Sequence, residues 1–208
     1  MELILIACSG KKTKGGTPDY PGSDLEKLLP SGTLQRLLRS RQELARLKNY
    51  PSGPDFGNRD TRGNILFKPA YLRYSGIVYE QSGFETLYPQ IKGKIVLIIS
   101  ALYGILEAGD SIRDYNMKMD ETLSNGNRLA TWWRNHTIGS ILEECILSIK
   151  PDTVHDLLSE VYRSALGPWP MKSLKQQGIP YNKYDYHGLG TGSLWHRGND
   201  LKNLLITR

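Results

Sequence analysis

A run of five consecutive aliphatic residues, Ile95 to Ile99, constrains the fold of this chain more than any other feature. The run has no alternation of apolar and polar side chains, which predicts a strand buried on both faces, as strands of a parallel sheet are. Ser100, Tyr103 and Gly104 follow it directly. Polar and aromatic residues at the carboxyl end of a buried strand are typical of the ligand crevice in an open α/β sheet. A plain turn from strand to loop is the alternative.

Two further segments repeat this pattern of a buried strand that ends in polar residues. The first runs from Leu3 to Ala7 and leads into a basic, glycine-rich loop. The second runs from Thr153 to Leu158 and leads into the polar cluster that begins at Ser159. Three such strands predict that polar loops gather at one edge of a sheet, where the carboxyl ends of parallel strands meet.

Helices are predicted where apolar residues recur at helical spacing, at 33–48, 129–149 and 199–206. Because strands alternate with helices, we predict an α/β fold: a single domain over residues 1–208 with a mainly parallel central sheet, flanking helices and long irregular loops. Residues 49–68 contain several Gly and Pro residues without a clear period, and they are predicted to form a mobile loop.

The chain carries a formal net charge of +6 and has a pI near 9.2, which favours polyanionic partners such as DNA or another nucleic acid, or a nucleotide. Arg36, Arg39 and Arg46 lie within the first predicted helix and are candidates for contacts with phosphates. A solvated basic face without a partner is the alternative interpretation.

Cysteine and histidine positions predict neither a disulfide framework nor a metal centre. The two cysteines, Cys8 and Cys145, are too few for a framework, and the four histidines have no metal-ligand spacing with them. We therefore expect no metal and no cofactor. The apolar N-terminus is too short for a signal peptide and no stretch is long enough to span a membrane, so we expect a cytoplasmic protein without a membrane partner.

The polar loops contain side chains suited to binding a nucleotide. Lys12 and the neighbouring backbone amides could hold a phosphate, although this loop is not a Walker A sequence and a structural turn is equally compatible. Tyrosine rings could stack on a base, and half-buried structural tyrosines are the alternative. We expect one cavity to be lined by a set drawn from all these loops: Ser9, Lys12, Ser100, Tyr103, Asp110 and Tyr162.

Two residues are candidates for catalysis, Asp110 and Lys12. Cleavage of a glycosidic bond needs a carboxylate that stabilises an oxocarbenium-like centre or directs a water molecule. Asp110 and Asp114 lie in the segment that follows the run Ile95 to Ile99, and Glu160 lies beside Ser159. A loop turn or a helix cap is the alternative role for Asp110. Cys8, beside Lys11 and Lys12, could carry a thiol with a lowered pKa that reacts with peroxide, and a small buried apolar role is the alternative.

Four blocks of the sequence, taken in order, resemble the YaaA-like peroxide-stress protein family. The most specific block agrees with the Ser-Gly-Leu-Tyr-Gly-Leu-Leu signature of the family and with the Asp, Tyr and Met that trail it. The four blocks cover much of residues 1–166, and they are Ser9-Gly10-Lys11-Lys12-Thr13, Tyr74-Ser75-Gly76-Ile77-Val78-Tyr79, Ser100-Ala101-Leu102-Tyr103-Gly104-Ile105-Leu106 with Asp110, Tyr115 and Met119, and Leu157-Leu158-Ser159-Glu160-Val161-Tyr162.

The chain departs from the family's pattern in its C-terminal segment, residues 167–208. The family usually ends with a basic Lys-x-Ala-Arg-Gly element, and this five-residue pattern is not present there. The segment instead offers basic residues such as Lys172, Lys175, His196 and Arg197. The chain is therefore identified as a divergent member of the family.

The resemblance implies a stress-response protein that associates with nucleic acid. With the loops above, the matched blocks predict a ligand-binding set: Ser9, Tyr74, Gly76, Ser100, Tyr103, Gly104, Tyr115, Ser159 and Tyr162. Three functions remain open: a nucleic-acid-associated protein whose base pocket cleaves N-glycosidic bonds, a DNA-binding protein of the peroxide response without catalysis, and an enzyme that acts on free nucleotides.

Overall fold

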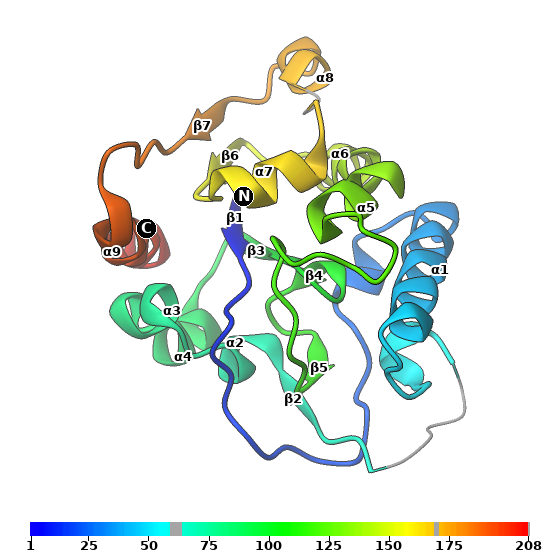
Figure 1. Ribbon diagram of the computed structural model, residues 1–208. Helices are drawn as coiled ribbons and strands as arrows, with labels where there is room; N and C mark the ends of the chain where they lie inside the picture. The colour runs from blue at the N-terminus through cyan, green and yellow to red at the C-terminus, as the bar shows by residue number, and fades with distance from the viewer. Residues whose placement is uncertain (59–63, 169–170, 208) are drawn as a thin grey trace.

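A computed structural model of the chain describes residues 1–58, 64–168 and 171–207, and only the backbone of residues 171, 172 and 191. A five-stranded sheet forms its centre, with the strand order β4-β3-β1-β6-β7 (Figure 1). Strands β3, β1, β6 and β7 are parallel, and only β4 is antiparallel to its neighbour. The predicted α/β fold with a mainly parallel sheet is confirmed. The strands are β1 (Glu2–Ala7), β3 (Lys94–Ser100), β4 (Gly104–Glu107), β6 (Thr153–Asp156) and β7 (Tyr181–Lys183).

The inner strands are buried on both faces because their sequences are almost wholly aliphatic. Leu3, Leu5, Val96 and Ile98 have no exposed surface, in agreement with the lack of alternation in the sequence. A separate antiparallel pair, β2 (Phe67–Pro69) and β5 (Ser111–Arg113), lies beside the sheet.

Helices cover the two faces of the sheet in two groups (Figure 1). One group comprises α3, α4 and α9, and α3 packs against α9; the other comprises α1, α5, α6 and α7. The helix bounds are α1 (Ser31–Leu47), α2 (Ala70–Arg73), α3 (Ile77–Ser82), α4 (Phe84–Leu87), α5 (Leu129–Asn135), α6 (Ile138–Ile149), α7 (Glu160–Leu166), α8 (Met171–Gln176) and α9 (Ser193–Ile206). Short 3₁₀ turns lie at Leu25–Lys27, Pro54–Phe56, Tyr88–Gln90 and Gly190–Gly192.

All three predicted helices differ in detail from those observed, and the helix expected at 199–206 begins earlier, at Ser193. The helix expected at 129–149 is two helices, because Thr137 has a left-handed backbone with φ +57° and breaks the ladder between α5 and α6. α1 begins at Ser31 rather than at Thr33, and the Thr33 hydroxyl donates to Glu144 on α6 instead of capping its own helix. A tertiary partner therefore decides where the Thr33 side chain binds.

The segment predicted as a mobile loop, 49–68, is anchored near its middle. The carboxylate of Asp55 is buried and accepts from the guanidinium of Arg113 at 2.5 Å and 2.7 Å, and from the hydroxyl of Tyr103 at 2.6 Å. The part of the prediction that concerns residues 59–63 lies outside the described residues. No helix within the described part of the chain is both long and apolar enough to cross a membrane.

The order of the strands determines where a ligand crevice can form. From β1 the chain continues to β3 on one side, and it later returns to β6 and β7 on the other side of β1. The direction of winding therefore changes between β1 and β6. Open α/β sheets bind ligands outside the carboxyl ends of the strands at such a switch point.

Candidate functional site

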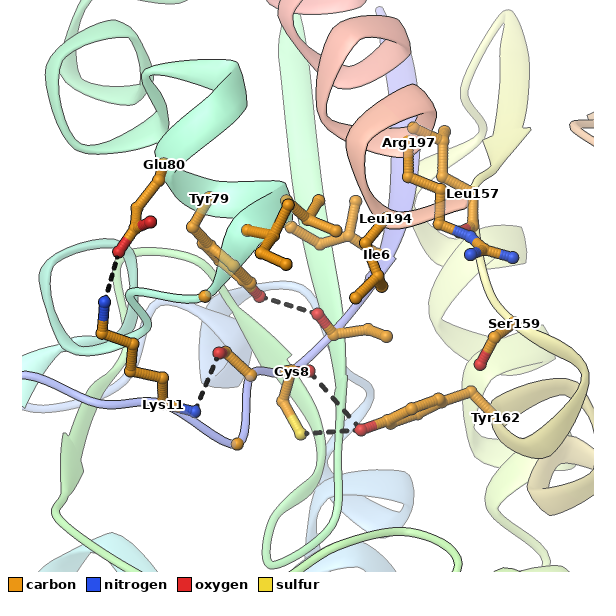
Figure 2. A pocket seen from close by; sticks show the side chains of 16 residues that line it. Ile6, Cys8, Lys11, Tyr79, Glu80, Leu157, Ser159, Tyr162, Leu194 and Arg197 are labelled. Atoms are coloured by element: carbon orange, nitrogen blue, oxygen red, sulfur yellow. Dashed lines mark hydrogen bonds and ion pairs between the residues drawn. The ribbon is translucent and has the colours of Figure 1, made fainter. Parts of the chain in front are cut away.

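A cavity of about 430 Å³ lies at the carboxyl ends of β1 and β6 (Figure 2). Four segments far apart in the sequence form it: the loop after β1, the start of α3, the β6–α7 connection and the first turns of α9. The lining residues are Ile6, Ala7, Cys8, Ser9, Gly10, Lys11, Gly76, Ile77, Val78, Tyr79, Glu80, Leu157, Ser159, Tyr162, Leu194 and Arg197. The cavity occupies the switch point of the sheet.

Cys8 and Tyr162 approach each other within the cavity, as Figure 2 shows. The Tyr162 hydroxyl lies 3.3 Å from Cys8 Sγ and 3.4 Å from the Cys8 carbonyl oxygen. Burial, and then the neighbouring Cys8, raise the pKa of Tyr162 well above its ordinary value. The phenol therefore remains neutral at physiological pH and can donate one hydrogen bond.

The loop after β1 lies against the start of α3. Ser9 Oγ accepts a hydrogen bond from the Lys11 amide at 3.1 Å, which closes a tight turn. Gly76 lies so close to this hydroxyl that an added Cβ would collide with Ser9 Oγ. The Tyr79 hydroxyl donates to the Ala7 carbonyl at 2.8 Å and ties α3 to the end of β1. Glycine at position 76 permits this close approach, and a larger residue would displace the Ser9 side chain.

The mouth of the cavity combines exposed apolar side chains with one ion pair. Ile77 is 50% exposed and Leu194 is 41% exposed, although both are aliphatic. Lys11 Nζ and Glu80 Oε1 form an ion pair at 2.7 Å on the rim. The charge of Lys11 is thus offset by its neighbour.

Arg197 is a cavity residue outside the set of site residues predicted from the sequence. Its Nε donates to the Leu157 carbonyl at 3.1 Å and its Nη1 to Ser193 Oγ at 3.0 Å, while the guanidinium lies 4.3 Å from the centroid of the Tyr186 ring. The following Gly198 allows α9 to approach α3, since a Cβ there would lie 2.6 Å from Gln81 Cβ. The Arg197-Gly198 pair repeats the last two residues of the basic element sought above, and that signal could have identified it.

Four of the predicted site residues line this one cavity: Ser9, Gly76, Ser159 and Tyr162. Four others form a neighbouring cluster outside its lining. Lys12 Nζ donates to the Ser9 carbonyl at 2.9 Å and lies 3.9 Å from the centroid of the Tyr115 ring, and burial lowers its pKa. The Tyr115 hydroxyl in turn lies 2.8 Å from that of Tyr74 and 2.9 Å from Ser100 Oγ.

The expectation of a single cavity that includes Tyr103 and Asp110 is corrected by the structure. Tyr103 is buried, donates to Asp55 at 2.6 Å and accepts from the Arg113 amide at 3.1 Å. Gly104 has φ +72°, and a Cβ there would lie 2.7 Å from Ile138 and 2.8 Å from Trp133. The physical reason is that β4 starts at Gly104 and turns the chain back along β3, away from the edge between β1 and β6.

Asp110 is 1% exposed and its two carboxylate oxygens accept three hydrogen bonds. The donors are the Ser23 hydroxyl at 2.9 Å, the Leu25 amide at 3.0 Å and the Glu107 amide at 2.9 Å. Asp110 does not line the cavity that Lys12 adjoins. These contacts fit the alternative role of Asp110, a loop turn.

The three arginines proposed to contact phosphates are exposed on α1, which belongs to the other helix group (Figure 1). Arg36 is paired with Glu144 on α6, with 2.5 Å between Nη2 and Oε2. No ion pair of Arg39 or Arg46 is found among the described residues. Within that same part of the chain, no cluster of three or more His, Cys, Asp or Glu residues is arranged to hold a metal ion.

Comparison with known proteins identifies relatives over most of the chain. A sequence model of the family described as "Peroxide stress protein YaaA" matches residues 23–187. A UPF0246 protein of Polynucleobacter necessarius is 30% identical over 151 residues, which are 70% of this chain and 57% of the relative. A UPF0246 protein of Methylibium petroleiphilum is 34% identical over 116 residues, 53% of this chain and 44% of the relative.

A third relative, a UPF0246 protein of Corynebacterium efficiens, is 32% identical over 141 residues, 61% of this chain and 52% of the relative. The chain thus spans about half the length of the curated relatives that it matches. The match to the family model includes the α3 and α7 walls of the cavity. The loop after β1 and helix α9 lie outside it.

Proposed function

This chain belongs to the peroxide stress protein YaaA family, and from that premise we propose that it is a nucleic-acid-associated protein whose cavity binds a nucleobase or nucleoside. The observation that carries the proposal is the cavity at the switch point between β1 and β6. Its volume of about 430 Å³ lies within the range of about 300–1,000 Å³ usual for small-molecule sites. Such sites are mostly apolar and contain a few polar groups that orient the ligand.

The character of the lining supports a flat, partly polar ligand. Ile77 and Leu194 provide apolar surface at the mouth. The hydroxyls of Ser9 and Ser159 supply donors and acceptors, and Tyr162 supplies a neutral phenol. A base has apolar faces and edges rich in hydrogen-bonding groups, and this lining matches both properties.

The basic charge supports association with nucleic acid outside the cavity. The chain carries a formal charge of +6, and three exposed arginines of α1 (Arg36, Arg39 and Arg46) are proposed to contact phosphates. The cavity and α1 lie in different parts of the molecule (Figure 1). Base recognition and backbone contacts are therefore separable by mutation.

Cleavage of an N-glycosidic bond is the finer form of the proposal. The reaction needs a carboxylate near the ligand, and the carboxylate that lines the cavity is Glu80 rather than Asp110. Lys12 does not line the cavity, and its Nζ contacts a lining residue through a hydrogen bond to the Ser9 carbonyl. Retained base binding without release of free base would favour binding alone, and release from mononucleotides but not from DNA would favour an enzyme of free nucleotides.

The test is calorimetric titration of the whole chain with free bases and nucleosides, using a variant that fills the cavity. Ser159→Trp introduces a large side chain into the lining, and Ser159 makes no capping hydrogen bond that would be lost. Ser164→Trp is the matched control, since Ser164 is exposed on α7, the helix that directly follows Ser159, and does not line the cavity.

We expect at least one base or nucleoside to bind the unmodified protein. Ser159→Trp should weaken that binding by tenfold or more, on the order of 1.4 kcal/mol, while Ser164→Trp leaves it unchanged. Circular dichroism and thermal unfolding should show that both variants remain folded. An unmodified protein that binds none of the bases and nucleosides would refute the proposed pocket.

A further inference from the structure

Arg197 contributes a positive charge to the cavity, and the two carboxylates that act on it from nearby, Asp156 and Glu160, are themselves paired with Arg163. The Nε and Nη1 groups of Arg197 donate to neutral acceptors, the Leu157 carbonyl and the Ser193 hydroxyl. No ion pair of Arg197 is found among the described residues, and its Nη2 group has no hydrogen bond with them. Lys11, the other basic residue of the lining, is paired with Glu80.

Two other arginines of the chain differ from Arg197 because a carboxylate neutralises each guanidinium. Arg113 binds both carboxylate oxygens of Asp55, and Arg163 binds Asp156 at 2.7 Å. Neither of these arginines lines the cavity. Among the charged residues of the lining, Lys11 and Glu80 offset each other, and Arg197 is left without an ion pair to a described residue.

Partial burial of the Arg197 guanidinium raises its free energy, and a bound anion would lower it. Arg197 is half-buried, and loss of hydration is the first cause that lowers the pKa of its guanidinium. Arginine nevertheless stays protonated near neutral pH, so the charge itself persists. A partly desolvated cation that has only neutral partners is unfavourable, and an anionic ligand group would compensate it through a charge-assisted hydrogen bond.

The position of Arg197 is set by the packing of α9 on α3. Gly198 allows the two helices to come into contact. At the next residue, Asn199, Oδ1 accepts a hydrogen bond from Gln81 Nε2 at 2.8 Å. Figure 2 shows the guanidinium on the same side of the cavity as Ser159, with Tyr162 beyond it. An anionic group bound to Arg197 would therefore lie beside the polar end of the cavity.

We propose that Arg197 binds the phosphate of the ligand, so that the cavity accepts a nucleotide in preference to a free base or nucleoside. This inference rests on the proposed function, because it assigns the phosphate to the ligand of the same cavity. The shared chemistry is a nucleotide phosphate, which can belong to a free mononucleotide or to a nucleic-acid strand. A phosphate also offers oxygens that a guanidinium can bind in its planar fork.

The experiment compares pairs of ligands by calorimetry at one fixed salt concentration. The probes are a nucleoside, its 5′-monophosphate and the methyl ester of that monophosphate, which imitates a strand phosphodiester. The variants are Arg197→Gln, Arg197→Lys and the matched control Lys202→Gln, which removes one exposed positive charge from α9 outside the cavity.

We expect the monophosphate to bind the unmodified protein at least about tenfold more tightly than the nucleoside. Arg197→Gln should abolish that advantage and leave nucleoside affinity within about threefold, while Lys202→Gln preserves both. Arg197→Lys should retain part of the advantage, because lysine keeps the charge but loses the fork. If Arg197→Gln does not fold, the phosphate advantage of the unmodified protein and its reduction in Arg197→Lys decide the question.

The outcomes separate this inference from the function on which it rests. A nucleoside that binds as tightly as its monophosphate overturns the role of Arg197 and leaves the base pocket standing. Absence of any binding overturns both. An advantage shared by the methyl ester supports the proposal and assigns the phosphate to a strand, whereas an advantage of the monophosphate alone supports it and assigns the phosphate to a free nucleotide.

Discussion

The hydroxyl of Tyr162 lies 3.3 Å from the sulfur of Cys8, although 154 positions separate the two residues in the chain. Cys8 follows β1 and Tyr162 lies in α7, which follows β6. Their contact joins the ends of two adjacent parallel strands across the cavity. The site is therefore a product of strand order rather than of any local motif.

Tyr162→Phe tests what this hydroxyl contributes. The variant keeps the ring and removes the hydroxyl that approaches Cys8, so we expect the free energy of unfolding to fall by no more than about 1.5 kcal/mol. Affinity for the base or nucleoside should fall several-fold, because the cavity loses a polar group. Urea unfolding and calorimetry measure the two effects. Tyr50→Phe is the control, since that hydroxyl is outside the cavity, and an equal loss of affinity there would contradict the assignment.

Tyr103→Phe should behave in the opposite way. The Tyr103 hydroxyl is buried between Asp55 and the Arg113 amide, so its removal leaves a buried carboxylate with fewer donors. We expect a loss of about 1–3 kcal/mol in the free energy of unfolding and unchanged ligand affinity. Denaturant unfolding with calorimetry on the folded fraction checks both. A variant of normal stability that binds the ligand weakly would show that Tyr103 belongs to the ligand site.

Asp110→Asn decides between a catalytic and a structural carboxylate. Asparagine keeps one oxygen acceptor, but an NH₂ group replaces the second oxygen and cannot accept a hydrogen bond. At least one of the three hydrogen bonds to Asp110 is therefore lost. We expect destabilisation by about 1–3 kcal/mol with no selective loss of binding or turnover. A variant of normal stability that binds ligand and no longer releases base would instead establish Asp110 as catalytic.

Glu107 should make the stability of the protein depend on pH near neutrality. Burial is the first cause that raises its pKa from 4.5 to about 7, and the nearby carboxylates Asp110 and Asp24 act in the same direction. Between these values the folded protein binds a proton that the unfolded chain has released. The stability that this proton contributes is therefore fully present below about pH 4.5 and is lost as the pH rises through about 7.

Glu107→Gln removes this titration while keeping an oxygen that can accept from Tyr88. The difference in unfolding free energy between the original protein and the variant should change by at most about 1.4 kcal/mol per pH unit. Urea unfolding at several values from pH 5 to pH 8 measures it. A difference that stays constant over this range would show that Glu107 is ionised in the folded state.

Replacement of Arg36, Arg39 and Arg46 by Gln tests the basic face of α1. Glutamine forms helices well and all three positions are exposed, so stability should change by less than about 1 kcal/mol. Affinity for a DNA duplex should fall, and its dependence on salt should become shallower, by about one unit of slope for each phosphate that the protein no longer neutralises. Titration of labelled DNA at several salt concentrations measures both. An unchanged slope would identify a solvated face.

The sequence alone determined the class of the fold and the family. Buried strands can be recognised from the local sequence. Ile95 to Ile99 and Leu3 to Ala7 lack any alternation of polar and apolar residues, and both segments form strands as predicted. Residues that directly follow β1 and β6, such as Ser9 and Ser159, were also predictable as cavity residues. Their position depends only on the direction of the strand before them.

Tertiary structure alone decided which strand ends share a cavity and what completes it. The polar and aromatic residues after β3 predict a ligand site as strongly as those after β1. However, β4 returns antiparallel to β3 and directs Tyr103 to Asp55, so the site lies between the ends of β1 and β6. Arg197 joins that site from a helix near the opposite end of the sequence from β1, through contacts of Gly198 and Asn199 with α3. Strand order and helix docking depend on the summed packing of distant segments, which no local pattern of side chains encodes.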